Sequence, residues 1–200
     1  MAELADRALT VLHEWVKSES LRKHCYAVAD SMKYFAQLRV RAGVAVDVDL
    51  WEAVGLLHDM DYEKHPNLER SSTEGHPFVG VQWLRDNGWS DEVCRAILSH
   101  ADYSGVEPQT DLEKTLRAVD ELSGFVVAVT LVRPSKSITD VELSSVKKKM
   151  KDKAFARAVN REEIVHGAER LGMPLDDVIT NVIAALKADA DRLGLAGGKS

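Results

Sequence analysis

Residues 50–59 read LWEAVGLLHD. The apolar side chains of this stretch, together with His58, recur at positions i, i+1, i+4, i+7 and i+8, which is the spacing of one face of an α-helix. Asp47 or Asp49 is a suitable cap for the start of such a helix. The stretch ends in a histidine and an aspartate, so the end of this helix presents an imidazole and a carboxylate side by side.

The same helical spacing continues through the chain on both sides of this stretch. Thr110 with Glu113 and Thr139 with Glu142 fit capping boxes, and only Val44–Val48 has the alternation of a short strand. We therefore predict an all-α fold with a loop over residues 60–74 and a frayed tail from about Gly194. The predicted helices span residues 2–16, from 18 or 20 to about 41, from 47 or 49 to 58, 77–88, 90–100, 110–132, from 139 onward, 160–172 and 174–193.

Composition narrows the class of protein. The 200 residues are 45% hydrophobic and 29% charged, which is typical of a globular chain with one large domain or two small ones. The longest uncharged apolar run, residues 122–132, is shorter than the ~20 residues that cross a bilayer, so we expect no membrane segment. Cys25 and Cys94 are too few for a disulfide framework and favour a cytoplasmic location. The net charge of −6 argues against a general nucleic-acid coat.

The candidate chemistry begins at the His58-Asp59 doublet. The end of a helix frees the second side chain to bend back, so both groups can point at one spot. An imidazole and a carboxylate together form a ligand set that suits Mn, Fe, Co, Zn or Mg.

Four more residues of these two types lie at or near predicted helix ends or on an apolar face. His24 lies near the start of the second helix, and Asp120 points along an otherwise apolar face, where a carboxylate without a partner is costly. His76 and His100 flank two helices that we expect to pack antiparallel, which returns His100 to the level of His76. Two imidazoles beside a carboxylate would make a second metal site.

In their order along the chain, these residues resemble the HD superfamily of metal-dependent phosphohydrolases, whose mark is H…HD…D. The two added histidines, in Gly75-His76-Pro77 and Ser99-His100, resemble the branch with two metal ions, which includes the HD-GYP phosphodiesterases. The resemblance covers roughly residues 21–125. It implies an HD-domain helical core over residues 1–133, with accessory C-terminal helices over residues 134–200 packed on it.

The resemblance also implies a ligand set and a reaction. The first metal would be held by His24, His58, Asp59 and Asp120. The second would be held by His76 and His100, with Asp59 bridging the two. One or two divalent ions (Mn, Mg, Fe, Co or Zn) would supply a hydroxide that attacks the phosphorus of a nucleotide or another small phosphate ester, whether a monoester or a diester.

The sequence departs from the HD-GYP pattern in two places. HD-GYP proteins continue the doublet as HDxGK and carry a second histidine directly after the one that matches His100. Here the doublet continues as MDYEK, and Ala101-Asp102 follows His100. These departures count against cyclic-dinucleotide specificity. They leave Asp61 and Lys64, with Glu63 and Asp102, as candidates for general acid or water positioning beside the catalytic Asp59.

A basic segment follows the helix that carries Asp120. Residues 133–153 contain seven Lys and Arg against three acids. The start of this segment can fold back over the site, so we predict that Arg133 and Lys136 contact substrate phosphate. The lysine run from Lys147 to Lys153 is either a solvated helix surface or an electropositive rim for a phosphorylated substrate. Nucleic acid is the less favoured substrate because no aromatic residue lies between the lysines.

Two other functions stay open at this point. A di-iron oxygenase of the same superfamily uses the same arrangement of ligands, but its inositol branch has a lysine where this chain has Tyr62. A catalytically silent module that senses a nucleotide would keep the fold, and it is disfavoured because every ligand position is filled. The expected partner is a small phosphorylated substrate, and apolar stripes on the terminal helices leave room for a homodimer.

Overall fold

A computed structural model describes residues 3–198 as a set of packed helices without a strand, which confirms the all-α prediction. Ala2, where the first helix was expected to begin, lies outside the described residues. The single β-bridge within residues 3–198 pairs Ser137 with Ala196. The α-helices are α1 (Glu3–Trp15), α2 (Glu19–Arg41), α3 (Val48–Leu57), α4 (Phe78–Asp86), α5 (Asp91–His100), α6 (Asp111–Leu131), α7 (Leu143–Met150), α8 (Arg161–Leu171), α9 (Leu175–Ala188) and α10 (Ala190–Leu193).

Side-chain caps start the helices that carry the site. The side chains of Ser18, Asp47 and Ser90 accept hydrogen bonds from backbone amides in the first turns of α2, α3 and α5. The Thr110 side chain accepts from the Glu113 amide, and the Glu113 carboxylate accepts from the Thr110 amide in return. These short-range bonds satisfy amides that have no partner inside the helix, so the local sequence fixes where each helix begins.

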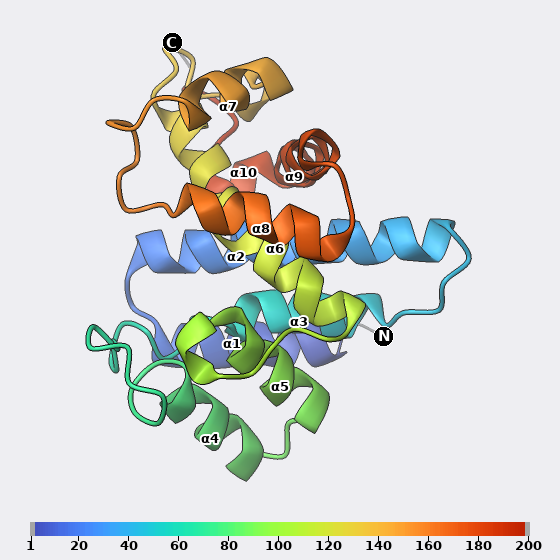
Figure 1. Cartoon of the computed structure of the whole chain (residues 1–200), viewed down its shortest axis with the longest axis vertical. Helices are drawn as coiled ribbons and strands as arrows, with labels where there is room; N and C mark the ends of the chain where they lie inside the picture. The colour runs from blue at the N-terminus through green and yellow to red at the C-terminus, as the bar shows by residue number, and fades with distance from the viewer. Residues whose placement is uncertain (1–2, 199–200) are drawn as a thin grey trace.

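The two longest helices, α2 and α6, cross at the centre of the molecule (Figure 1). Helix α3 packs against α2 and α1 on one side of this crossing, and α8 and α9 pack against α6 and α2 on the other. Helix α3 approaches α2 closely at Gly55, where an added Cβ would lie 2.5 Å from the Cα of Ala29. Phe125, Leu57 and Met32 are among the fully buried side chains between these layers. The crossing brings the start of α2, the end of α3 and the middle of α6 to one place.

The C-terminal part differs from the prediction at three points. Residues 138–140 form a 3₁₀ turn, and α7 begins at Leu143 without the capping box predicted for Thr139, because Ile138 and Val141 are buried in the core. The predicted last helix is divided at Asp189 into α9 and α10. The chain does not fray from Gly194 within the described residues, since Leu195 is 1% exposed and its carbonyl accepts from the Ile138 amide at 2.8 Å. The division into a core and accessory helices at residues 133 and 134 stays a prediction.

None of the helices in residues 3–198 combines the length and the apolar character that crossing a membrane requires.

The buried carboxylate of Asp30 ties α2 to the C-terminal helix α10 through Arg192. Burial raises the pKa of Asp30 to about 7, and the Arg192 guanidinium opposes that rise. At pH 5, below this raised pKa, the Asp30 carboxyl is neutral in the folded protein. At pH 8 it is ionised, and its buried negative charge is then stabilised by the Arg192 guanidinium. Arg192→Ala is therefore expected to lower the free energy of unfolding by roughly 1–3 kcal/mol at pH 8, and by less at pH 5.

Urea unfolding of wild type and variant at the two pH values measures this difference, with Arg192→Lys as the variant that keeps the charge. An equal loss at both pH values would instead assign the effect to the packing of Arg192 on the Tyr26 ring, whose centroid lies 5.0 Å away.

Candidate metal centre

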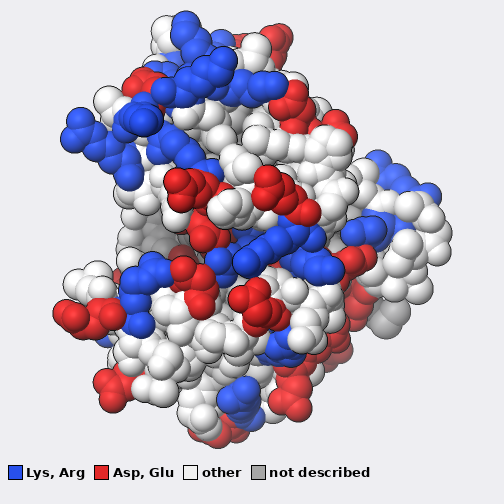
Figure 2. Space-filling model, viewed as in Figure 1, with Lys and Arg blue, Asp and Glu red and all other residues white. Residues whose placement is uncertain are grey.

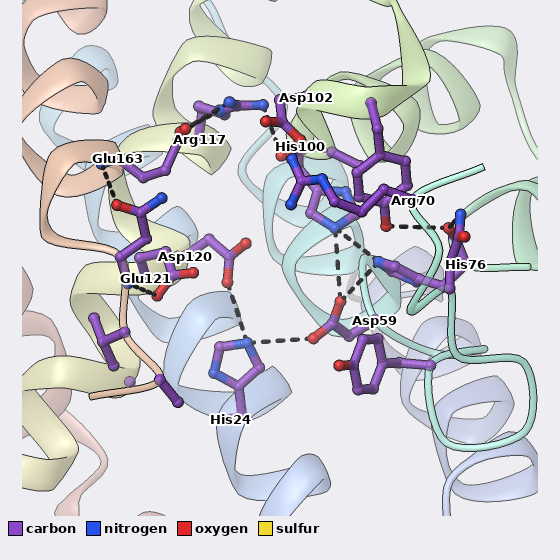
Figure 3. Close-up of a pocket in the computed structure, with 18 of the residues that line it drawn as sticks. His24, Asp59, Arg70, His76, His100, Asp102, Arg117, Asp120, Glu121 and Glu163 are labelled. Atoms are coloured by element: carbon purple, nitrogen blue, oxygen red, sulfur yellow. Dashed lines mark hydrogen bonds and ion pairs between the residues drawn. The ribbon is translucent and has the colours of Figure 1, made fainter. Parts of the chain in front are cut away.

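Five of the six predicted ligands line one pocket of about 660 Å³ (Figure 3). His58 is fully buried behind the other five, which line the pocket. They come from separate parts of the chain: the start of α2, the end of α3, the residue before Pro77, the end of α5 and the middle of α6. The fold thus brings together side chains that are up to 96 residues apart, from His24 to Asp120.

The first cluster is formed by His24, His58, Asp59 and Asp120. The Nε2 atom of His24 lies 3.2 Å from Nε2 of His58, 3.1 Å from Oδ1 of Asp120 and 3.5 Å from Oδ2 of Asp59. The Nε2 atom of His58 lies 3.5 Å from the same oxygens of Asp59 and Asp120. Two imidazole nitrogens and two carboxylate oxygens therefore converge on one small space, which fits the ligand preferences of a divalent ion.

The second cluster shares Asp59 and adds His76 and His100. The Nε2 atoms of the two histidines lie 3.2 Å apart, and Oδ1 of Asp59 lies 3.3 Å from His76 and 3.6 Å from His100. The two oxygens of Asp59 thus face different clusters, Oδ2 the first and Oδ1 the second. This is the arrangement in which one carboxylate can bridge two cations.

Backbone and side-chain acceptors orient three of the imidazoles. The Nδ1–H of His58 donates to the Gly55 carbonyl at 2.8 Å, that of His100 donates to the Ile97 carbonyl, and that of His76 donates to Oδ1 of Asp61 at 2.7 Å. Because each acceptor requires a proton on Nδ1, the lone pair of each neutral ring lies on Nε2 and points into a cluster. Such outer hydrogen bonds are typical of histidines that bind metals.

The carboxylates of Asp59 and Asp120 are ionised at neutral pH. Burial disfavours the charged forms of Asp59 and Asp120, yet His58 and the neighbouring imidazoles hold the pKa of both carboxyls below its ordinary value. Burial also disfavours the charged form of His58, and the same two carboxylates nevertheless raise the pKa of His58 to about 9. Both shifts show that positive charge is stabilised in the space between these side chains.

Glu121 and Tyr103 line the pocket and have raised pKa values, and the sequence interpretation selected neither of them. Burial and the adjacent Asp120 carboxylate raise the pKa of Glu121 to about 7. Burial and the Asp59 carboxylate raise the pKa of Tyr103 to about 12, so its hydroxyl keeps its proton, and it donates to the His76 carbonyl at 3.1 Å.

Asp61 does not face the pocket, contrary to its predicted role as a catalytic group. Its side chain is 1% exposed, and it accepts from Nδ1–H of His76 through one oxygen and from the Gly80 amide through the other, each at 2.7 Å. A Cβ at residue 80 would lie 2.9 Å from Cγ of Asp61, so glycine is what lets the carboxylate reach this amide. Asp61 is therefore placed to position His76 from behind, a role that the sequence interpretation did not assign to it.

Three predicted basic residues also lie away from the pocket. Lys64 places its ammonium 4.9 Å from the centroid of the Trp15 ring, and Arg133 donates to Oγ of Ser145 at 3.1 Å. Arg133 and Lys136 follow the far end of α6, which continues for eleven residues, or ~17 Å, beyond Asp120. The expected folding back of this segment over the site is not seen, and neither Arg133 nor Lys136 lines the pocket, so the structure does not support a contact of these residues with substrate phosphate.

The arginines that do line the pocket are Arg70 and Arg117. Arg70, at the rim, pairs with Asp102. Arg117 is 8% exposed, and it donates to the His100 carbonyl at 2.9 Å and to the Glu163 carboxylate at 2.8 Å. Arg117 precedes Asp120 by three residues on the same face of α6, and this spacing is the signal that could have revealed it.

Comparison with known proteins matches residues 21–124 of the chain to the HD domain. An uncharacterized protein of Methanocaldococcus jannaschii is 30% identical over 119 residues, which are 58% of this chain and 64% of that protein. Ribonuclease Y of Cutibacterium acnes is 29% identical over 82 residues, which are 41% of this chain and 14% of the enzyme. The chain thus spans less than two thirds of either relative. No solved structure matches it. The matched residues 21–124 contain all six converging side chains.

Proposed function

The chain belongs to the HD domain family, and on this premise we propose that it is a metal-dependent phosphohydrolase acting on a nucleotide or another small phosphate ester. The observation that carries the proposal is the division of the Asp59 carboxylate between two clusters, each completed by imidazole Nε2 atoms. The ligands we propose are His24, His58, Asp59 and Asp120 for one divalent ion, and His76, His100 and the shared Asp59 for a second.

A pair of divalent ions at these positions would supply a hydroxide nucleophile and neutralise the charge of the phosphate oxygens. The chain's own residues would hold this geometry. Gly55, Ile97 and Asp61 fix the ring orientations of three histidines, and Arg117 secures the end of α5 that carries His100. The role of the protein is then mainly positioning and charge, as in phosphoryl transfer generally.

The pocket supports a substrate of small size. Its volume of about 660 Å³ falls within the range of small-molecule sites. The residues that line the pocket include Tyr62, Leu68 and Tyr103, and Tyr62 and Leu68 are 44% and 82% exposed. An apolar and aromatic wall beside a metal-binding cluster suits an organic group such as a nucleobase attached to the phosphate. Arg70 at the same rim can pair with a further phosphate oxygen.

The test is turnover of a panel of nucleotides and other phosphate esters, followed by chromatography of the products. Mn²⁺, Mg²⁺, Fe²⁺, Co²⁺ and Zn²⁺ are added separately to protein stripped with a chelator. Release of phosphate or of a nucleoside that depends on metal supports the proposal. Oxygen consumption by the iron-loaded protein without hydrolysis would replace the proposal with an oxygenase. Ligand binding without either reaction would indicate a sensing module.

The buried carboxylate behind His76 gives a prediction about the second cluster. Asp61→Asn replaces one of two accepting oxygens with an NH₂ group, so either the Gly80 amide or the Nδ1–H of His76 loses its acceptor. We expect affinity at the second cluster to fall 10–100-fold, with the first cluster unchanged.

Calorimetric titration with Mn²⁺ or Zn²⁺ measures this effect as the weakening of one of two sites. Asp102→Asn, at the pocket rim and outside both clusters, is the matched control. If two sites fill with wild-type affinities in Asp61→Asn, the positioning role of Asp61 is wrong.

A further inference from the structure

A strongly basic ridge lies outside the residues that match the HD domain. Residues 147–157 contain six basic side chains and one acid, a charge of +5, in a chain whose total is −6; the other residues therefore sum to −11. The members of the basic ridge are Lys147, Lys148, Lys149, Lys151, Lys153 and Arg157. Lys and Arg side chains gather over α7 and the segment after it, at the upper left of the face seen in Figure 2.

Most of this charge is not compensated within the protein. Lys147 pairs with Asp176 at 2.7 Å, and Lys149 lies 3.6 Å from Asp152 and 4.6 Å from the centroid of the Phe155 ring. The other four members of the basic ridge are exposed, and no carboxylate in residues 3–198 forms an ion pair with them. Like charges held this close repel one another, so the basic ridge stabilises any polyanion that lies along it.

Lys147, Lys148 and Lys149 are consecutive residues of α7, so their side chains point to different faces of this helix. Helix α7 ends at Met150, and residues 151–159 form turns that lead to α8. Lys151, Lys153 and Arg157 therefore lie on the turns that follow α7, where all three are exposed.

The same segment leads directly into the candidate metal pocket. Ala158, Val159 and Asn160 line the pocket, and the Asn160 amide donates to the carboxylate of Glu121 at 3.2 Å. These pocket residues follow Arg157 by one to three positions in the sequence. A chain of phosphates lying on the basic ridge would thus end at the wall of the pocket.

We propose that the basic ridge is a binding site for single-stranded nucleic acid, and that it guides one end of a phosphodiester chain into the pocket. The guiding role rests on the proposed function, whereas binding itself does not. A single strand is favoured over a duplex because the pocket has the size of a small-molecule site. Phe155 packs edge-on against Phe125 and beneath Lys149, so it is not free to stack with bases. Binding is therefore electrostatic and independent of base sequence.

The experiment is fluorescence anisotropy of end-labelled oligouridylate and oligothymidylate of about 15 nucleotides, in EDTA so that no hydrolysis occurs. The test variant is Lys148→Ala/Lys151→Ala/Lys153→Ala, and the matched control is Lys33→Ala/Lys114→Ala/Lys187→Ala, which removes the same charge elsewhere. Thermal melts confirm that both variants fold.

Four cations of the basic ridge are free to bind phosphate. We therefore expect a plot of the logarithm of the association constant against the logarithm of the salt concentration to have a slope of about −3 for wild type and the control. The expected slope for the ridge variant is about −1. We also expect the ridge variant to bind at least about tenfold more weakly at low salt.

No binding by wild type, or equal losses in the two triple variants, would overturn the proposal. Equal or tighter binding to phosphatidylserine vesicles or to polyglutamate would also overturn it, because the site would then be a membrane or acidic-protein surface.

The proposed hydrolase activity and the proposed binding at the basic ridge can be rejected independently of each other. Oligonucleotide binding in EDTA without turnover of any ester rejects the hydrolase, and hydrolysis of mononucleotides without oligonucleotide binding rejects the ridge.

Discussion

Asp59→Asn is expected to lower phosphate-ester hydrolysis by at least about a thousandfold and to reduce metal content at both clusters. The carboxylate offers Oδ2 to His24 and His58 and Oδ1 to His76 and His100. An asparagine keeps one of these oxygens and turns the other into a donor, and it also removes the negative charge that both clusters share. No neighbouring side chain replaces that charge at both places, because Asp120 contacts the first cluster alone.

The measurement combines turnover of the best substrate with elemental analysis of protein loaded with Mn²⁺ or Zn²⁺ and then desalted. Asp102 lines the same pocket without contacting either cluster, so the Asp102→Asn variant should retain metal at both clusters. Two equivalents of tightly held metal in Asp59→Asn would contradict the bridging role, even if turnover were lost for another reason.

Gly55→Ala is expected to produce the largest loss of stability among single-methyl additions near the site. The new Cβ would lie 2.5 Å from Cα and 2.8 Å from the backbone nitrogen of Ala29. Both are backbone atoms inside α2, so the clash is relieved only if α3 moves as a whole. We expect the free energy of unfolding to fall by about 3 kcal/mol and Tm to fall by about 6–12 °C.

The same movement would disturb the first cluster, because His58 donates to the Gly55 carbonyl. Differential scanning calorimetry gives Tm, and metal titration reports the cluster. Gly124→Ala is the matched control, since it also lies inside a helix but meets its nearest neighbour, Nδ1 of His24, at an ordinary 3.6 Å. The control should change stability by less than about 1 kcal/mol. An unchanged Tm in Gly55→Ala would mean that α2 and α3 are not held together as described.

Local chemistry accounts for the parts of the fold that the sequence predicted well. The caps Ser18, Ser90 and Thr110 act within three residues of themselves, so their effect is visible in the sequence. The failure at Thr139 has a tertiary cause, because burial of Ile138 holds the preceding turn in a 3₁₀ conformation and delays the helix to Leu143.

The candidate site likewise has features that the sequence could predict and features that depend on tertiary contacts. The converging residues could be predicted because few chemical types bind metals and because their order resembled that of a family. The role of Asp61 could not be predicted from the sequence, because it depends on the close approach of Gly80, which is 19 residues away. The ion pair of Arg117 could not be predicted for a similar reason. Arg117 finds its carboxylate 46 residues later in Glu163, and no local spacing indicates such a pair.

The ion pair between Arg117 and Glu163 also constrains how the residues matched to the HD domain and the helices that follow them can change in evolution. Arg117 lies within the residues matched to the HD domain, whereas Glu163 lies outside them, on a helix that packs so closely on α6 that Gly167 cannot carry a Cβ without meeting Ala118. A lineage that lost or exchanged α8 would leave a buried guanidinium without its counter-charge beside the carbonyl of His100. We therefore expect positions 117 and 163 to change together, and we expect relatives that lack the later helices to carry a neutral residue at position 117.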